Sequence, residues 1–208
     1  MNTNDWPSAD TDIAVIGMAC RFPGAQDART FWRNLIEGTE SISLLDPSSA
    51  ASANPDYRAS PDFRAAAGML PDIDQFDAGL FGYGARESEL MDPQHRLFLE
   101  CAWETFEDAG YAPSDIEGLV GVYAGCGNNT YLINHVHPGV GYFPGRTFLE
   151  SVRDFQVLLG NQGDFIATRV SYKLNLRGPS INLQTACSTS LVAIHLACQS
   201  LILLTRPH

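Results

Sequence analysis

The residue best placed to do chemistry is Cys187, which stands where an apolar strand is expected to end and an apolar helix to begin. A strand, a tight turn and a helix in this order form the layout of a nucleophile elbow. Unpaired backbone N–H groups and the positive end of the helix dipole favour the reactive thiolate form of a cysteine at a helix N-terminus. The same N–H groups can bind the oxyanion that forms when a thioester carbonyl is attacked. The pattern therefore predicts a thiol nucleophile.

A structural role is the alternative for Cys187, because free cysteine is among the most buried residue types and often packs as a small hydrophobe. That role is favoured for Cys20, Cys101 and Cys198, which have apolar neighbours. Cys126 is a weaker candidate nucleophile, since it follows an expected strand in a loop where no helix begins. Five cysteines without a C-x-x-C pair favour reduced cytosolic thiols over a disulfide framework or a zinc site.

A thiol enzyme normally needs a histidine beside its nucleophile, and the sequence offers no convincing one. His195 lies two helical turns beyond Cys187, roughly 12 Å away by helical rise, and cannot act on it directly. His95 falls in the first turn of another expected helix, which favours a surface or capping role. The remaining histidines lack the further ligands that would indicate a metal site: His135, His137 and His208.

Three short apolar runs are expected to form the strands that position this cysteine. They cover residues 12–19, 119–125 and 180–185, and the first has the continuous β-branched character of a central strand covered on both faces. Because helical segments alternate with these runs, the sequence predicts an α/β fold with a parallel sheet.

Cap residues frame two of the expected helices. Asp27 can cap a helix that stops at Gly38. Asp92, followed by proline, opens a second helix that closes at Gly110. Between these helices, residues 45–61 are rich in Pro, Ser and Ala without periodicity, so we expect a surface loop there.

The apolar run from Leu191 to Leu204 follows the candidate nucleophile directly. It is interrupted by three polar residues and is shorter than the ~20 apolar residues that cross a bilayer, so we expect a buried helix and no membrane partner. The first ten residues show no basic segment followed by an apolar run, which argues against a secretory signal. The expected location is therefore the cytoplasm.

The composition is that of a folded, acidic protein. Of its 208 residues 45% are hydrophobic and 18% charged, and 13 Lys and Arg against 24 Asp and Glu give a net charge of −11. That sign is wrong for neutralising phosphates, which argues against nucleic acid as a partner. Residues 1–144 carry 7 basic and 21 acidic side chains, whereas residues 145–208 carry 6 and 3. The last third is therefore the part that suits an acidic partner.

Four blocks of sequence, in this order along the chain, indicate a family more specifically than the composition does. They are residues 13–24; 76–82 with 91–96 and 101–104; 164–180; and 185–190, which reads Thr-Ala-Cys-Ser-Thr-Ser. Together they resemble the ketosynthase (β-ketoacyl synthase) domain of modular polyketide synthases, and the resemblance runs from residue 12 to about 203. We expect residues 1–11 to be a lead, 12–204 the N-terminal region of the ketosynthase, and 205–208 a tail outside the match.

The resemblance implies an α/β, thiolase-like fold, of which this chain would supply only the N-terminal half of the two-half α/β/α architecture, an incomplete fold. It implies that Cys187 accepts an acyl chain from a phosphopantetheine thioester on an acyl carrier protein, ahead of decarboxylative Claisen condensation. It also implies a homodimer and no cofactor or metal on the domain itself. The family's carrier protein is typically acidic, which suits the less acidic last third.

The chain departs from the family where it stops. It has neither the His-Gly-Thr-Gly-Thr segment nor the late Asn-x-Gly-His segment that supply the family's catalytic histidines. We therefore expect self-acylation at most, and no condensation by this chain alone. The alternatives are a non-catalytic, truncated remnant that serves as a dimerisation or interaction module, and an independent thiol hydrolase.

The missing continuation should also leave a sheet edge unpaired and one apolar helix face uncovered. We predict a chain that aggregates or is stable only with a partner. Circular dichroism and sizing of the isolated chain test this prediction, and a cooperative, monodisperse monomer would contradict it.

Overall fold

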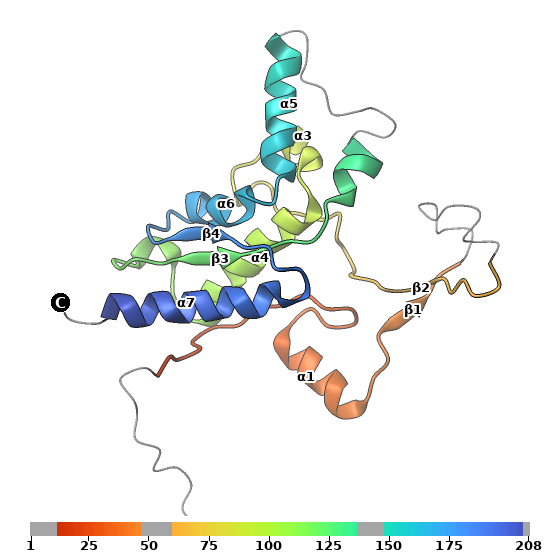
Figure 1. The fold of residues 1–208 in the computed structure, drawn as a ribbon, viewed down its shortest axis with the longest axis horizontal. Coiled ribbons are helices and arrows are strands. Elements are labelled where there is room, and N and C mark those ends of the chain that lie inside the picture. The colour runs from red at the N-terminus through yellow and green to blue at the C-terminus, as the bar shows by residue number, and fades with distance from the viewer. Residues whose placement is uncertain (1–11, 47–59, 137–147, 206–208) are drawn as a thin grey trace, which may run out of the picture. The chain divides into compact units, whose positions relative to one another are not determined.

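The computed structural model describes residues 12–46, 60–136 and 148–205, with side chains of 148–153, 204 and 205 left out (Figure 1). The chain forms two compact units. We name one the β3–β4 unit, after strands Val122–Ala124 and Ser180–Asn182; its described residues are 12–18, 106–127 and 163–205. We name the other the α4–α5 unit, after helices Pro93–Asp108 and Phe148–Asn161; it contains the described residues within 19–105 and 128–162. The elements run α1 (Ala28–Glu37), β1 (Ile42–Leu44), β2 (Ala66–Gly68), α3 (Ala85–Leu90), α4 (Pro93–Asp108), η1 (Pro113–Asp115), β3 (Val122–Ala124), η2 (Leu132–Val136), α5 (Phe148–Asn161), α6 (Phe165–Lys173), β4 (Ser180–Asn182), η3 (Ala186–Ser188) and α7 (Thr189–Thr205).

Strands β3 and β4 form the parallel pair at the centre of the β3–β4 unit, as the sequence predicts. Their register sets Val122 opposite Ser180 and Ala124 opposite Asn182. Helix α6 contacts both strands and α7 contacts β3, so the two helices flank the pair (Figure 1). Parallel strands need a crossover segment between them, and α6 lies in that segment. The two predicted strands are confirmed, although each is only three residues long.

The prediction of a central strand at residues 12–19 is wrong for the part of the chain that the structure describes. These residues pair with none of the described strands, and Val15 is 78% exposed. The Met18 N–H donates instead to the Asp108 carboxylate at 2.8 Å. Apolar β-branched residues make a strand only where a neighbouring strand supplies hydrogen-bond partners, and the described residues offer none here.

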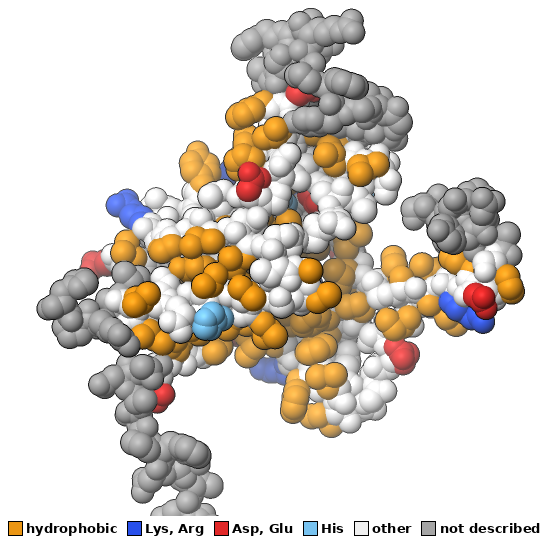
Figure 2. Space-filling model, viewed as in Figure 1, with side chains coloured by type: hydrophobic (Ala, Val, Ile, Leu, Met, Phe, Trp, Pro, Cys, Tyr) orange, Lys and Arg blue, Asp and Glu red, His pale blue; other side chains and the backbone are white. Residues whose placement is uncertain are grey.

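Helix α7 begins where predicted, but the expectation that it is buried is wrong. Of its described side chains only Ala193 is buried, and Leu191 is 71% exposed. Figure 2 shows hydrophobic side chains gathered over this helix. By length and composition alone, the window Ala186–Leu203, with a mean hydropathy of 1.6, passes a test for membrane-spanning helices that core helices of soluble proteins also pass. A helix that is apolar on all sides is suited to cover on all sides, and most of that cover is absent among the described residues.

The α4–α5 unit holds the better covered core. Its buried apolar side chains include Leu90, Met91, Leu99 and Val157, which come from α3, the α3–α4 junction, α4 and α5. Strands β1 and β2 pair antiparallel at residues 42–44 and 66–68. The predicted surface loop at residues 45–61 lies mostly outside the described residues.

Local capping sets the ends of two helices, as predicted. The Asp27 carboxylate accepts the Thr30 N–H at 2.7 Å at the start of α1, and Gly38 ends α1 with a φ of 65°. A left-handed φ of this kind suits glycine, because residues with a Cβ atom adopt this backbone conformation only at a cost. Helix α4 begins at Pro93, and Gly110, with a φ of 74°, follows its end.

Candidate active site

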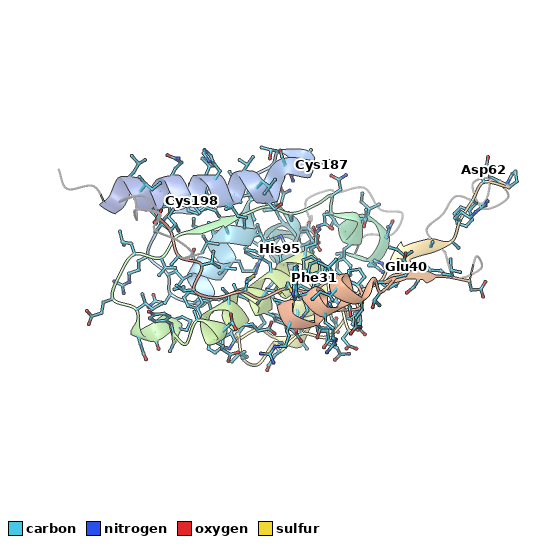
Figure 3. The ribbon with its side chains drawn as sticks, turned by 90° about the horizontal axis from the view of Figure 1, so that it is seen from below. Phe31, Glu40, Asp62, His95, Cys187 and Cys198 are labelled. Carbon is cyan, nitrogen blue, oxygen red and sulfur yellow. The ribbon has the colours of Figure 1, made fainter. Side chains whose placement is uncertain are left out.

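Cys187 lies in η3, the single turn that connects β4 to α7. Figure 3 shows it at the N-terminal end of α7, with Cys198 further along the same helix. The Cys187 side chain is exposed to solvent. Two N–H groups next to the thiol already donate within the turn, because the Ser188 and Thr189 N–H groups bond to the Thr185 and Ala186 carbonyls. The N–H groups left to bind an anion are therefore those of the following residues in the first turn of α7.

A tight set of hydrogen bonds holds the turn that carries Cys187. Ala186 has a φ of 52°, in the left-handed region that is unfavourable for a residue with a Cβ atom. The Thr189 hydroxyl accepts the Thr185 N–H at 3.0 Å and donates to the Ala186 carbonyl at 2.8 Å. The Ser188 hydroxyl donates to the Thr185 carbonyl at 2.8 Å. These bonds compensate for the cost of the strained residue directly before the thiol.

The loop after β3 lies against this turn. A Cβ atom built on Gly125 would overlap Thr189 Cγ2 and stand 2.5 Å from the Leu183 carbonyl oxygen, so only glycine fits at this position. Cys126 follows Gly125 and is partly buried. A Cβ atom built on Gly163 would stand 2.9 Å from the Cys126 Sγ. Gly125 is a residue that sequence reasoning missed, although glycine at the end of a strand signals a close backbone approach.

The two candidate nucleophiles, Cys126 and Cys187, therefore both follow the carboxyl ends of neighbouring parallel strands. That edge is where ligands bind in open α/β sheets. Of the two, Cys187 has the exposed sulfur and the helix beginning beside it, whereas no helix begins at Cys126.

The other cysteines stand in different surroundings. Burial is the main reason that the pKa of the Cys101 thiol is raised, and burial followed by the nearby Asp27 carboxylate raises the pKa of Cys20. Both thiols lie near the ion pair between Arg21 and Glu104. Cys198 is partly buried on α7. Partial burial agrees with the packing role expected for these three residues.

The structure changes one prediction about the histidines. His95 is buried, with 1% of its surface exposed, so the surface role expected for it is wrong. The first turn of α4 belongs to the core of the α4–α5 unit, where Arg96 is also buried.

The other described histidines are exposed. His195 lies on α7, and the ring of His135 stacks on that of Tyr131 with 5.2 Å between the ring centroids. His137 and His208 lie outside the described residues.

A cavity outside the Cys187 turn lies in the α4–α5 unit. It has a volume of about 180 Å³ and is lined by residues that include Arg21, Leu70 and Glu100. The Arg21 guanidinium is already bound to Glu104 and to two backbone carbonyls, so it has little capacity left for an anion. Across the described ranges, no group of three or more His, Cys, Asp or Glu side chains could hold a metal ion.

Comparison with known proteins identifies the family. Residues 10–204 match the model of the β-ketoacyl synthase N-terminal domain. The chain is 46% identical over 196 residues to one of the phenolphthiocerol/phthiocerol polyketide synthase subunits of Mycobacterium tuberculosis, covering 91% of this chain and 13% of that protein. It is 38% identical over 199 residues to the pikromycin polyketide synthase component PikAII of Streptomyces venezuelae, covering 92% and 5%.

Solved structures agree. Ketosynthase twelve of the bacillaene polyketide synthase of Bacillus amyloliquefaciens superposes with a TM-score of 0.77 at 33% identity, over 93% of this chain and 33% of that one. The ketosynthase from module 6 of the bacillaene synthase of Bacillus subtilis 168 superposes with a TM-score of 0.70 at 37% identity, over 92% and 29%.

These matches define the class of protein as a ketosynthase with a thiolase-like fold. The chain belongs to the β-ketoacyl synthase family and has the N-terminal part of its fold, as the sequence predicts. It is a ketosynthase N-terminal domain of the polyketide synthase type. The chain spans 13% or less of these two polyketide synthases and no more than a third of the two solved ketosynthases.

Proposed function

We propose that Cys187 is the acyl-accepting nucleophile of a polyketide ketosynthase and that residues 12–204 form the region that presents it. The observation that carries the proposal is an exposed thiol in the turn between a parallel strand and the start of a long helix. In the proposed step the Cys187 thiolate attacks the carbonyl carbon of a thioester. A carbon–sulfur bond from the acyl carbon to Cys187 forms, the bond between the acyl carbon and the sulfur of the substrate thioester breaks, and the departing thiolate takes a proton from water.

The start of α7 supplies the electrostatic support for this step. Charge develops on the carbonyl oxygen as the thioester is attacked, and backbone N–H groups at a helix N-terminus stabilise such an oxyanion. The turn bonded through Thr189 keeps the thiol beside these groups before the substrate arrives. A preformed site of this kind needs little reorganisation during the reaction.

The substrates and partners in this proposal are those of the ketosynthase family. The acyl chain arrives on the phosphopantetheine of an acyl carrier protein, and the domain itself needs no further cofactor or metal. The whole protein acts as a cytoplasmic homodimer in decarboxylative Claisen condensation. Since these 208 residues contain neither histidine segment of the family, we expect them alone to form the acyl-enzyme and no condensation product.

Incubation with an N-acetylcysteamine thioester tests the proposal. We expect the mass of one acyl group on the tryptic peptide that contains both Cys187 and Cys198, placed on Cys187 by fragmentation, and no modification at that position in Cys187→Ala. Cys198→Ala, on the same helix, is the matched control and should leave acylation of Cys187 intact. Acyl mass on other cysteines but none on Cys187 would contradict the proposal.

A second candidate function, an interaction module without catalysis, is favoured by one observation, the exposed apolar surface of α7. The same experiment separates the two functions. Self-association together with the absence of acyl mass at Cys187 would support the module, while release of free acid over many turnovers would indicate a thiol hydrolase.

A further inference from the structure

Gln184 lies between β4 and the Cys187 turn, and its side-chain amide reaches the neighbouring loop. The Gln184 Nε2 donates to the Cys126 carbonyl oxygen at 2.7 Å. The Gln184 Oε1 lies 3.3 Å from the Thr189 hydroxyl oxygen. That hydroxyl has one hydrogen and uses it in the shorter bond to Ala186, so the bond to Cys126 is the stronger of the two Gln184 contacts.

The hydrogen bond from Gln184 to the Cys126 carbonyl lies just beyond the ends of β3 and β4, where the backbone leaves the two strands. The Leu183 N–H donates to the Ala124 carbonyl at 2.8 Å, one residue beyond the paired positions. One residue further along, the Gln184 side chain makes the next hydrogen bond between the segment after β4 and the segment after β3. On the same loop, Gly125 lies so close to Thr189 that a Cβ atom would not fit between them. The β3 loop therefore touches the Cys187 turn both through a hydrogen bond and by direct contact.

Gln184 is exposed, so burial does not force its amide to find a partner. A hydrogen bond at the surface contributes little to global stability because water competes for both groups. Its effect should therefore be local, on the geometry of the turn. Small displacements of a reacting group have large effects on rate, which makes such a local restraint important for a nucleophile.

We propose that Gln184 is a positioning residue for Cys187: through the Cys126 carbonyl it fixes the Cys187 turn against the β3 loop, and so holds the thiol in place at the N-terminal end of α7. This inference rests on the proposed function of Cys187. Gln184 does not touch the reacting atoms in this proposal and acts only through the turn.

The test compares two reactions of Cys187 in the full 208-residue chain, followed on the same tryptic peptide. Acyl transfer from an N-acetylcysteamine thioester needs an aligned thiol, whereas alkylation by iodoacetamide needs only an accessible thiolate. Gln184→Met keeps the length of the side chain and removes the donor. We expect acyl transfer to slow about fivefold, the ratio that one neutral hydrogen bond supports, with alkylation unchanged. Gln199→Met, at an exposed glutamine on α7, should change neither rate.

The outcomes separate the role of Gln184 from the function proposed for Cys187. Equal changes in both reactions, or unchanged acyl transfer in Gln184→Met, would overturn the role of Gln184 while the function proposed for Cys187 stands. Absence of acyl mass on Cys187 in the unmodified chain would overturn both. If circular dichroism shows that Gln184→Met does not fold, Gln184→Glu takes its place. An ionised carboxylate cannot donate to the Cys126 carbonyl, so the same loss of acyl transfer is expected.

Discussion

Helices α4 and α7 are nearly equal in length, at 16 and 17 residues, yet one is covered and the other is not. In α4, Leu99 has no exposed surface, and His95 and Arg96 are buried beside it. In α7 only Ala193 is buried among the described side chains. Polar residues separate the apolar positions of α4, whereas apolar residues surround α7. The apolar pattern of a helix therefore indicates how much cover it needs, and the available neighbours decide whether it obtains that cover.

The largest expected effect distinguishes the two helices by stability. Leu99→Ala should lower the free energy of unfolding by about 3 kcal/mol, because it opens a cavity in a covered core. Leu191→Ala removes a side chain that already faces solvent and should change it by less than ~0.5 kcal/mol. Urea unfolding of both variants measures the difference. Equal losses would mean that α7 is covered in solution.

A second comparison uses a cysteine from each region. Cys187, exposed before α7, should be alkylated by iodoacetamide faster than Cys101 on α4. Burial raises the pKa of the Cys101 thiol, so less of it is thiolate at a given pH, and its rate should keep rising as the pH is increased. Peptide mapping at timed intervals between about pH 7 and pH 9, around the ordinary thiol pKa, gives both rates. Faster labelling of Cys101 would show that the two environments are assigned the wrong way round.

The smallest effect concerns α1, whose start depends on a local cap rather than on cover. The hydrogen bond from the Thr30 backbone N–H lowers the pKa of Asp27, so the carboxylate stabilises α1 above the pKa of the unfolded chain. This contribution is lost as the pH falls through the lower pKa of the folded state. Asp27→Asn retains an N-cap without titration and should remove this part of the acid dependence. Thermal melts of both chains between about pH 3 and pH 7 test the prediction, and unchanged acid dependence in Asp27→Asn would contradict it.

The reliable sequence predictions were those with a local cause. Asp27, Gly38 and Gly110 act through hydrogen bonds and backbone conformation within a few residues, so the ends of α1 and α4 follow from the sequence. The turn from strand to helix at Cys187 belongs to the same group, since apolar runs on both sides define it. The four sequence blocks likewise identified the family that the comparisons show.

The failures share a different cause. Residues 12–19 have the composition of a central strand, but a strand also requires partners, which the described residues do not supply. His95 looks like a surface residue until the packing of α4 is known. Gln184 does not stand out in the sequence, and the glycine at the end of β3, Gly125, signals a close approach without showing to what; both matter through contacts with segments about 60 residues away.

The amino-acid sequence by itself determined the family of this protein, the ends of α1 and α4 and the place of one cysteine between strand and helix. Those features depend on residues that are close along the chain, and covalent geometry fixes the spacing of such residues. Only the tertiary structure decided which apolar segments find partners, which histidine is buried and which side chains brace the Cys187 turn. These features depend on contacts between segments distant in the sequence, and such contacts exist only once the chain has folded.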